Sequence, residues 1–172
     1  MANISSAVGT LTFTVDGTEE DLRYVMQTIL RETRKWTYST YVDENEIQDA
    51  DVLTVKPGMF RSTVRFDGDG RWAYECNIDA MGEALKERLP EEDVEKLESL
   101  DFVIRFNYVD EESGCGLLYR KIEELRHPKG CPLDRLTNAL ISNTNYKYTR
   151  ENLRHLFGYD EDLAQERTQE AG

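Results

Sequence analysis

Hydrophobic and polar residues alternate strictly near the start of the chain. Within residues 9–16, every second side chain is apolar: Leu11, Phe13 and Val15. This alternation is typical of a half-buried strand. After Gly17, Thr18 and Asp21 form a capping-box pattern at a helix start. The apolar residues that follow recur at helical spacing, at Leu22, Val25, Met26, Ile29 and Leu30. The pattern therefore predicts a strand followed by an amphipathic helix.

The next part of the chain is rich in β-branched and aromatic residues, which favour strands. We expect an antiparallel meander formed by residues 36–42, 51–56 and 59–68. Pro57-Gly58 is predicted as one turn and Asp67-Gly68-Asp69-Gly70 as another. The acidic segment 43–51 is interpreted as a loop, and residues 71–78 as a further strand.

The second half is predicted as helix, then hairpin, then short helices. Residues 79–100 are expected to be helical with a restart at Pro90, which suits the first turn of a helix. Residues 101–110 alternate again and lead through 111–114 into a hairpin partner at 115–122. Further on, Leu133, Leu136, Leu140 and Ile141 predict a short helix. Residues 142–148 are expected as a polar loop, and Thr149 as the cap of a last short helix.

These elements predict one α+β domain at residues 1–157, with helices packed on one face of an antiparallel sheet. Residues 9–120 form its sheet-and-helix core and residues 121–157 a short helical appendage. The acidic residues 158–172 are expected to fray.

Composition limits the class of protein. The 172 residues are 39% hydrophobic, which is too apolar for a disordered acidic chain. The sequence has no apolar run of the ~18 residues that span a bilayer and no signal-peptide pattern, so a cytoplasmic protein is expected. Cys76, Cys115 and Cys131 are expected to be reduced, and no metal or cofactor is predicted.

The net charge of −13 is unevenly distributed. Residues 1–117 hold 25 acidic and 12 basic side chains, whereas residues 118–156 hold 4 acidic and 8 basic ones. Such a density of negative charge costs stability. The acidic runs therefore either form a functional surface that binds a basic partner, which is the leading hypothesis, or serve solubility alone. The candidate partner-binding residues are Asp43, Glu44, Glu46, Asp49, Asp51, Glu91, Glu92, Asp93, Glu95 and Glu98.

Other sites stay open as alternatives. The basic stretch includes Arg120, Lys121, Arg126, His127, Lys129, Arg135, Lys147, Arg150 and Arg154, and Tyr146 and Tyr148 flank Lys147. Direct binding to nucleic acid is not expected of so acidic a chain, because phosphate contacts need clustered Lys and Arg. As an alternative, this stretch can grip single-stranded nucleic acid, or it can pair with the protein's own acidic face or with a second copy. A small-ligand pocket would be lined by Trp72, Tyr74, Phe106 and Tyr108. Cys115 with His127 or His155 lacks the spacing of a nucleophile and its base, so an enzyme is not expected.

Two segments carry a resemblance to known proteins. One is Gly70-Arg71-Trp72 followed by Tyr74, Glu75 and Asn77; the other is the aromatic strand 102–108 leading into the acidic turn 110–116. Behind an N-terminal strand and helix, this arrangement over residues 9–120 resembles small ferredoxin-like proteins of phages and plasmids. In size and acidity the chain is also similar to anti-CRISPR inhibitors, some of which imitate DNA. The resemblance implies a non-enzymatic inhibitor that binds a basic nucleic-acid-binding effector and blocks its substrate site.

Overall fold

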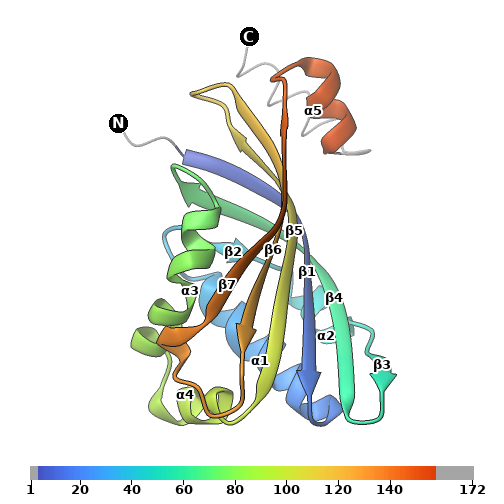
Figure 1. The fold of residues 1–172 in the computed structure, drawn as a ribbon, viewed down its shortest axis with the longest axis vertical. Coiled ribbons are helices and arrows are strands. Elements are labelled where there is room, and N and C mark those ends of the chain that lie inside the picture. Colours follow the sequence, from blue (N-terminus) through green and yellow to red (C-terminus); the bar gives the residue numbers. More distant parts are fainter. Residues whose placement is uncertain (1–3, 158–172) are drawn as a thin grey trace.

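Seven antiparallel strands form the centre of the protein in the computed structural model, which describes residues 4–157 (Figure 1). The strands lie in the order β2-β4-β1-β5-β6-β7, and β3 also pairs with β4. Their bounds are β1 Ile4–Asp16, β2 Thr40–Tyr41, β3 Leu53–Lys56, β4 Met59–Arg71, β5 Asp101–Glu112, β6 Leu117–His127 and β7 Thr137–Tyr146. The helices are α1 Glu19–Thr33, α2 Glu44–Asp49, α3 Glu75–Arg88, α4 Glu91–Glu98 and α5 Arg150–Leu156, with a 3₁₀ turn at Leu133–Arg135. The predicted α+β class is confirmed.

The N-terminal strand and helix form as the sequence predicts. The Asp21 amide donates to Thr18 Oγ1 at 3.1 Å, and the Thr18 amide donates to Asp21 Oδ2 at 3.0 Å. This reciprocal pair satisfies two amides at the helix start that have no partner within the helix. The apolar stripe of α1 is buried, at Leu22, Val25, Met26, Ile29 and Leu30.

The core fills the space between one face of the sheet and the helices α1, α3 and α4 (Figure 1). Alternate strand residues point into it, among them Leu11, Phe13, Val15, Val64, Phe66, Phe102, Ile104 and Phe106. The helices contribute Ile78, Met81, Leu85 and Leu97. Because helices cover this face, the residues between these positions belong to the opposite face of the same strands.

The predicted turn at residues 67–70 is wrong, because β4 continues through it to Arg71. Both glycines make room for the start of α3. A Cβ on Gly68 would lie 2.4 Å from the Tyr74 ring, and one on Gly70 would lie 2.6 Å from the Tyr74 amide nitrogen. Residues 71–78 therefore form a tight turn and the start of α3 in place of the predicted strand. Trp72 adopts the left-handed conformation in this turn, with φ of 70°.

Three other local predictions are also corrected. The expected loop at residues 43–51 contains α2, and of the expected strand at 36–42 only Thr40–Tyr41 pairs. The predicted appendage at 121–157 is mostly sheet, since β6 continues to His127 and β7 replaces the helix and loop expected there. The last helix, capped by Thr149, is confirmed as α5, and the predicted acidic tail lies outside the described residues.

α5 stands apart from the other helices, at the upper end of the sheet in Figure 1. It packs Leu153 against Val109 of β5 and Leu118 of β6, which belong to the face opposite the core. The Tyr148 hydroxyl fixes the approach to α5 by donating to Glu111 Oε1 at 2.6 Å. The rest of that face has no helix over it among residues 4–157.

Candidate functional site

The helix-free face of the sheet carries a regular arrangement of arginine and threonine side chains. Strand register places them in four cross-strand rows: Arg61-Thr14-Val103-Arg126, Thr63-Thr12-Arg105-Glu124, Arg65-Thr10-Asn107-Ile122 and Asp67-Val8-Val109-Arg120. Rows two residues apart are about 6.7 Å from one another, so the four rows extend over about 20 Å. We call this surface the arginine face, defined by the exposed Arg61, Arg65, Arg105, Arg120 and Arg126.

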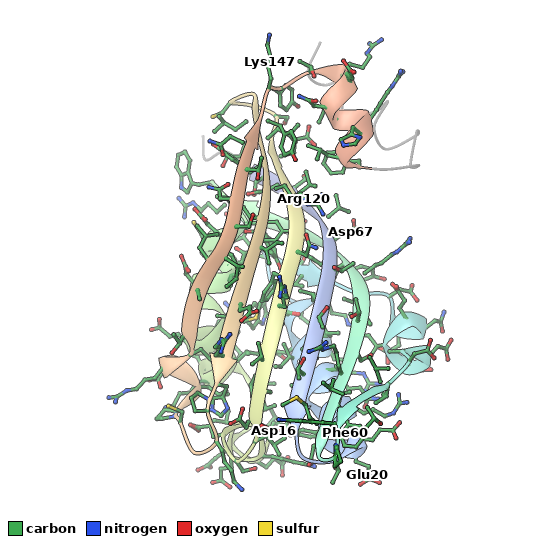
Figure 2. All side chains as sticks on the ribbon, turned by 45° about the vertical axis from the view of Figure 1, so that its right-hand side comes forward. Asp16, Glu20, Phe60, Asp67, Arg120 and Lys147 are labelled. Carbon is green, nitrogen blue, oxygen red and sulfur yellow. The ribbon has the colours of Figure 1, made fainter. Side chains whose placement is uncertain are left out.

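The arginine face is hollowed along its length. A groove of about 540 Å³ lies over β4, β1, β5 and β6 and is lined by Arg61, Arg105 and Arg126 together with threonines and Glu124. A second groove of about 340 Å³ continues toward α5, where Arg120 faces His155 and Leu156. Figure 2 shows Arg120 at the α5 end of the sheet and Asp16 at the opposite end. The hollow surface is long and polar, in contrast to the enclosed apolar pocket that a small ligand prefers.

Positive charge exceeds negative charge on this face. The four rows contain five arginines and two carboxylates, those of Glu124 and Asp67. Glu124 is shared, since it lies 2.8 Å from Arg126 and 3.5 Å from Arg105. Arg65 and Arg120 make no side-chain hydrogen bond or ion pair within residues 4–157. Carboxylates end the positive surface at both ends: Asp16 and Asp101 are paired in the row beyond Arg61, and Asp69 and Glu111 lie in the row beyond Arg120.

Most of the acidic side chains of the described residues lie on the other side of the sheet. Helices α1 to α4 together carry 16 acidic and 5 basic residues, a net charge of −11, whereas residues 4–157 as a whole carry 29 acidic and 20 basic residues, a net charge of −9. The sheet thus separates an acidic helical layer from the arginine face. The two sets of charges face solvent on opposite sides of the molecule, so water and salt screen each set from the other.

Half of the ten predicted partner-binding carboxylates hold the protein's own structure. Asp43 caps α2 by accepting from the Asn45 amide at 2.9 Å. Glu44 pairs with Arg31 and Arg34, whose hydrogen bonds lower the pKa of Glu44 to about 2. Three further carboxylates have such roles beside Asp43 and Glu44. Glu46 accepts from the Arg65 amide, Asp93 accepts from the Tyr24 hydroxyl, and Glu98 accepts from the Leu133 amide.

The other five predicted residues are exposed and form no side-chain hydrogen bond or ion pair within the described chain: Asp49, Asp51, Glu91, Glu92 and Glu95. They do not make one patch. In Figure 1, α2 lies beside β3 and β4, whereas α4 lies at the other side of the molecule. A partner that used both groups would have to reach around α1.

The predicted basic stretch divides between the two faces of the sheet. Arg120 and Arg126 belong to the arginine face, but Lys121 points the other way and is only 4% exposed. His127 is buried, with its ring nitrogens 2.7 Å and 2.6 Å from the carbonyl oxygens of Leu100 and Cys131. Tyr146 and Tyr148 pack against the small apolar cluster of Val109, Leu118 and Leu153. Their rings are therefore not free to stack on bases.

The alternative of an aromatic ligand pocket is wrong, and core packing, the other interpretation of these aromatic residues, is confirmed for three of the four. Tyr74, Phe106 and Tyr108 are buried in the core with Phe66, and their ring centroids lie 5.1 to 6.4 Å apart. Trp72, the fourth predicted residue, lies outside this cluster with half of its surface exposed. The aromatic residues stabilise the fold.

Carboxyl groups with raised pKa values surround Lys121 near the start of α3. Burial raises the pKa of Asp110, Glu112 and Glu123 above the usual range of carboxyl groups. Each polar partner in this group comes from the protein itself: Lys121 pairs with Glu75 at 2.9 Å, and the Tyr108 hydroxyl donates to Glu123 at 2.8 Å. Within residues 4–157 no group of three or more His, Cys, Asp or Glu side chains is arranged to hold a metal ion. We interpret this cluster as structural.

Sequence reasoning missed the arginine face because its members are far apart in the chain. Arg61, Arg65 and Arg105 lie in the segment identified only as acidic. The signal that could have found them is the alternation itself, since Arg61, Thr63 and Arg65 occupy the polar positions of a strand. Only the pairing of β1 with both β4 and β5 brings them beside Arg105.

Comparison with known proteins gives no match to a family model, to a curated protein or to a solved structure. None of the described helices is long and apolar enough to cross a membrane. The arginine face and the acidic helical layer are therefore the observations on which a function is inferred.

Proposed function

We propose that the protein is a non-enzymatic binding protein whose arginine face takes the phosphate backbone of a nucleic acid. The observation that carries this proposal is the set of five exposed arginines on one hollowed sheet face of a protein with a net charge of −13. Arg61, Arg105 and Arg126 line one groove of this face and Arg120 lines the other. Arginine binds phosphate oxygens through two parallel N–H donors, and threonine hydroxyls add further donors. Surplus cations within one groove of an acidic protein fit a polyanion better than a neutral ligand.

The chemistry of the groove favours contacts to the backbone over contacts to the bases. The 540 Å³ groove is lined by arginine, threonine, valine, methionine and glutamate side chains, and by no aromatic residue. Stacking on aromatic rings is the usual source of base contacts to single strands. We therefore expect binding that depends weakly on sequence and strongly on salt concentration.

The test is fluorescence anisotropy with labelled single- and double-stranded DNA and RNA over a range of salt concentrations. We expect Arg65→Glu/Arg120→Glu to weaken binding by at least about tenfold, because each hydrogen bond to a charged group contributes about 1.5 to 3 kcal/mol. The slope of log affinity against log salt should fall by about one for each arginine that no longer neutralises a phosphate. Neither arginine has an ion pair within residues 4–157, so the fold should be retained.

The matched control is Lys129→Glu/Arg135→Glu, which changes the net charge equally at exposed residues outside the arginine face. The control should keep most of the affinity. An unmodified protein that binds none of the four nucleic acids at low salt would contradict the proposal. Equal reductions in the two double variants would show that net charge alone, and no particular face, governs binding.

A second candidate function rests on the acidic helical layer. Here the exposed carboxylates of α4 bind a basic nucleic-acid-binding effector and block its substrate site, in the manner of a mobile-element anti-CRISPR inhibitor. The net charge of −11 on α1 to α4 supports this candidate. The ferredoxin-like relationship, a cytoplasmic location and a phage or plasmid origin belong to the same proposal.

The second candidate is tested by target cleavage with a panel of CRISPR effector nucleases. We expect inhibition that weakens as salt rises and that Glu91→Lys/Glu92→Lys/Glu95→Lys abolishes, because long-range attraction controls such encounters. Arg65→Glu/Arg120→Glu should leave this inhibition in place, which separates the two candidates. Inhibition that is indifferent to salt or to the α4 substitutions would rule out the electrostatic mechanism.

A further inference from the structure

β7 forms one border of the sheet and pairs only with β6. It is ten residues long, from Thr137 to Tyr146, and nearly all of its residues are exposed. One side of its backbone therefore presents N–H and C=O groups that no other strand within residues 4–157 pairs. A long free edge of this kind is a ready template for another strand.

This edge lacks three of the means by which natural sheet edges avoid pairing, namely charge, proline and short length. Charged residues make up 32% of the chain, yet β7 (TNALISNTNY) has none, and it has no proline. The opposite border is protected: β2 has two residues, and β3 has four and ends at Lys56 before Pro57. β7 is therefore the less protected border of the sheet.

Two apolar side chains stand at the middle of β7. Leu140 is 55% exposed and Ile141 is 50% exposed. The register with β6 shifts between Ile122 and Glu123, so Ile141 has no partner on that strand. This bulge divides β7 into two regular runs, Thr137–Leu140 and Ser142–Tyr146, each free to pair along its outer side.

We infer that β7 pairs antiparallel with β7 of a second copy of this chain, which joins two sheets into one. A strand with no charge meets no repulsion from its own copy, although the whole chain carries −13. Antiparallel pairing of identical strands follows two-fold symmetry, so that Leu140 and Ile141 of one copy meet the same residues of the other. The asparagine, serine and threonine side chains of β7 both donate and accept hydrogen bonds, so they suit a self-complementary seam.

The two-fold symmetry determines where the two arginine faces of the dimer lie, and its effect on nucleic-acid binding rests on the proposed function. The two-fold axis of an antiparallel pair within one sheet is perpendicular to the sheet. Both arginine faces then lie on the same side of the joined sheet, and both acidic helical layers lie on the other. The dimer would present ten arginines to one nucleic acid and bind it more tightly than a single copy does.

The experiment is sedimentation velocity of the full chain without nucleic acid over a wide concentration range. The unmodified protein should approach twice the 19.9-kDa mass of one chain. Leu140→Lys/Ile141→Lys, and the milder Ile141→Lys, should sediment as monomers while keeping the thermal unfolding of a folded protein. The matched control is Leu53→Lys/Val55→Lys on β3, whose exposed side chains lie at the other border. This control should remain a dimer.

Hydrogen exchange gives a second measurement that does not depend on a variant. Amides of β7 that face outward should become protected as protein concentration rises, whereas those of β3 should not. A protein that stays at 19.9 kDa at every concentration, or a dimer that persists in Leu140→Lys/Ile141→Lys, would overturn the inference. Because nucleic acid is absent, failure here leaves the proposed function untouched, and failure to bind nucleic acid leaves the dimer untouched.

Discussion

Replacement of Lys121 by methionine is expected to lower the free energy of unfolding near neutral pH by about 1 to 3 kcal/mol. This is less than the cost of about 3 to 5 kcal/mol for a fully buried ion pair, because the Glu75 side chain is 41% exposed. Lys121 is 4% exposed and lies 2.9 Å from Glu75. Its charge also lowers the pKa of Asp110, Glu112 and Glu123, in opposition to burial, which raises them. Without Lys121, four carboxyl groups would share this region with no counter-charge.

The destabilisation should shrink as pH falls. A carboxyl group whose pKa is raised on folding binds its proton more tightly in the folded state. Lowering the pH through the interval between its folded-state pKa and its lower unfolded-state pKa therefore stabilises the folded state. In the Lys121→Met variant these pKa values rise further, because the opposing positive charge is gone. Its stability should therefore increase more steeply on acidification than that of the unmodified protein. Urea unfolding at several pH values measures both slopes.

Lys86→Met is the matched control, because Lys86 pairs with Asp134 at 3.1 Å on the surface, where both side chains are at least 40% exposed. Exposed pairs contribute about 0 to 1 kcal/mol, so this variant should change stability little and with no pH dependence of the same kind. Adding Glu123→Gln to Lys121→Met should restore part of the stability. A Lys121→Met destabilisation that is the same at all pH values would contradict the role assigned to the carboxyl cluster.

Local signals in the sequence predicted an element correctly where two of them agreed. Thr18 and Asp21 mark a helix start, and the apolar spacing from Leu22 onward marks the buried side of the same helix, so α1 is predicted almost to its ends. The hairpin of β5 and β6 follows from the strict alternation in residues 101–110 and the glycine-containing turn after them. These elements depend on neighbouring residues, which the sequence displays directly.

The predictions failed where a distant residue decides the structure. The glycines at 68 and 70 resemble a turn, but they lie in a strand because the Tyr74 ring and the start of α3 pack against them. Leu136 and Leu140 have helical spacing, but residues 137–146 form a strand because they pair with the edge of β6. Pairing of this kind overrides local propensity, because a strand beside an existing edge satisfies its backbone hydrogen bonds at once.

The candidate site shows the same limit. The acidic runs were visible because their members are adjacent in the chain, yet Glu44, Asp93 and Glu98 serve internal contacts. The arginine face was not visible because Arg61 and Arg105 meet only through β1, which contributes threonines and Val8, and no charged residue, to the four rows. Net charge by segment therefore identified the acidic helices but did not reveal the cationic face on the opposite side of the sheet.

Replacement of Gly9 by alanine is expected to cost at least about 3 kcal/mol, at the upper end of the range for overpacking. Gly9 lies in β1 between Phe66 of β4 and Tyr108 of β5. A Cβ at this position would lie 2.0 Å from the Asn107 carbonyl oxygen and 2.6 Å from the Tyr108 Cα. Both are backbone atoms of a strand paired on its two sides, so neither can move without disturbing β5 and β6.

Gly58→Ala makes the same chemical change without a clash, since nothing lies within 4 Å of a Cβ there, but its φ of +79° adds strain of about 1 kcal/mol. Comparing the two by urea unfolding separates overpacking from the removal of glycine flexibility. The backbone of Gly9 also lines the groove that leads from Arg120 toward α5. A forced separation of β1 from β5 would spread the arginine rows, so Gly9→Ala should weaken nucleic-acid binding where Gly58→Ala does not. Equal stability of the two variants would mean that the close approach of β1 and β5 is not required for the fold.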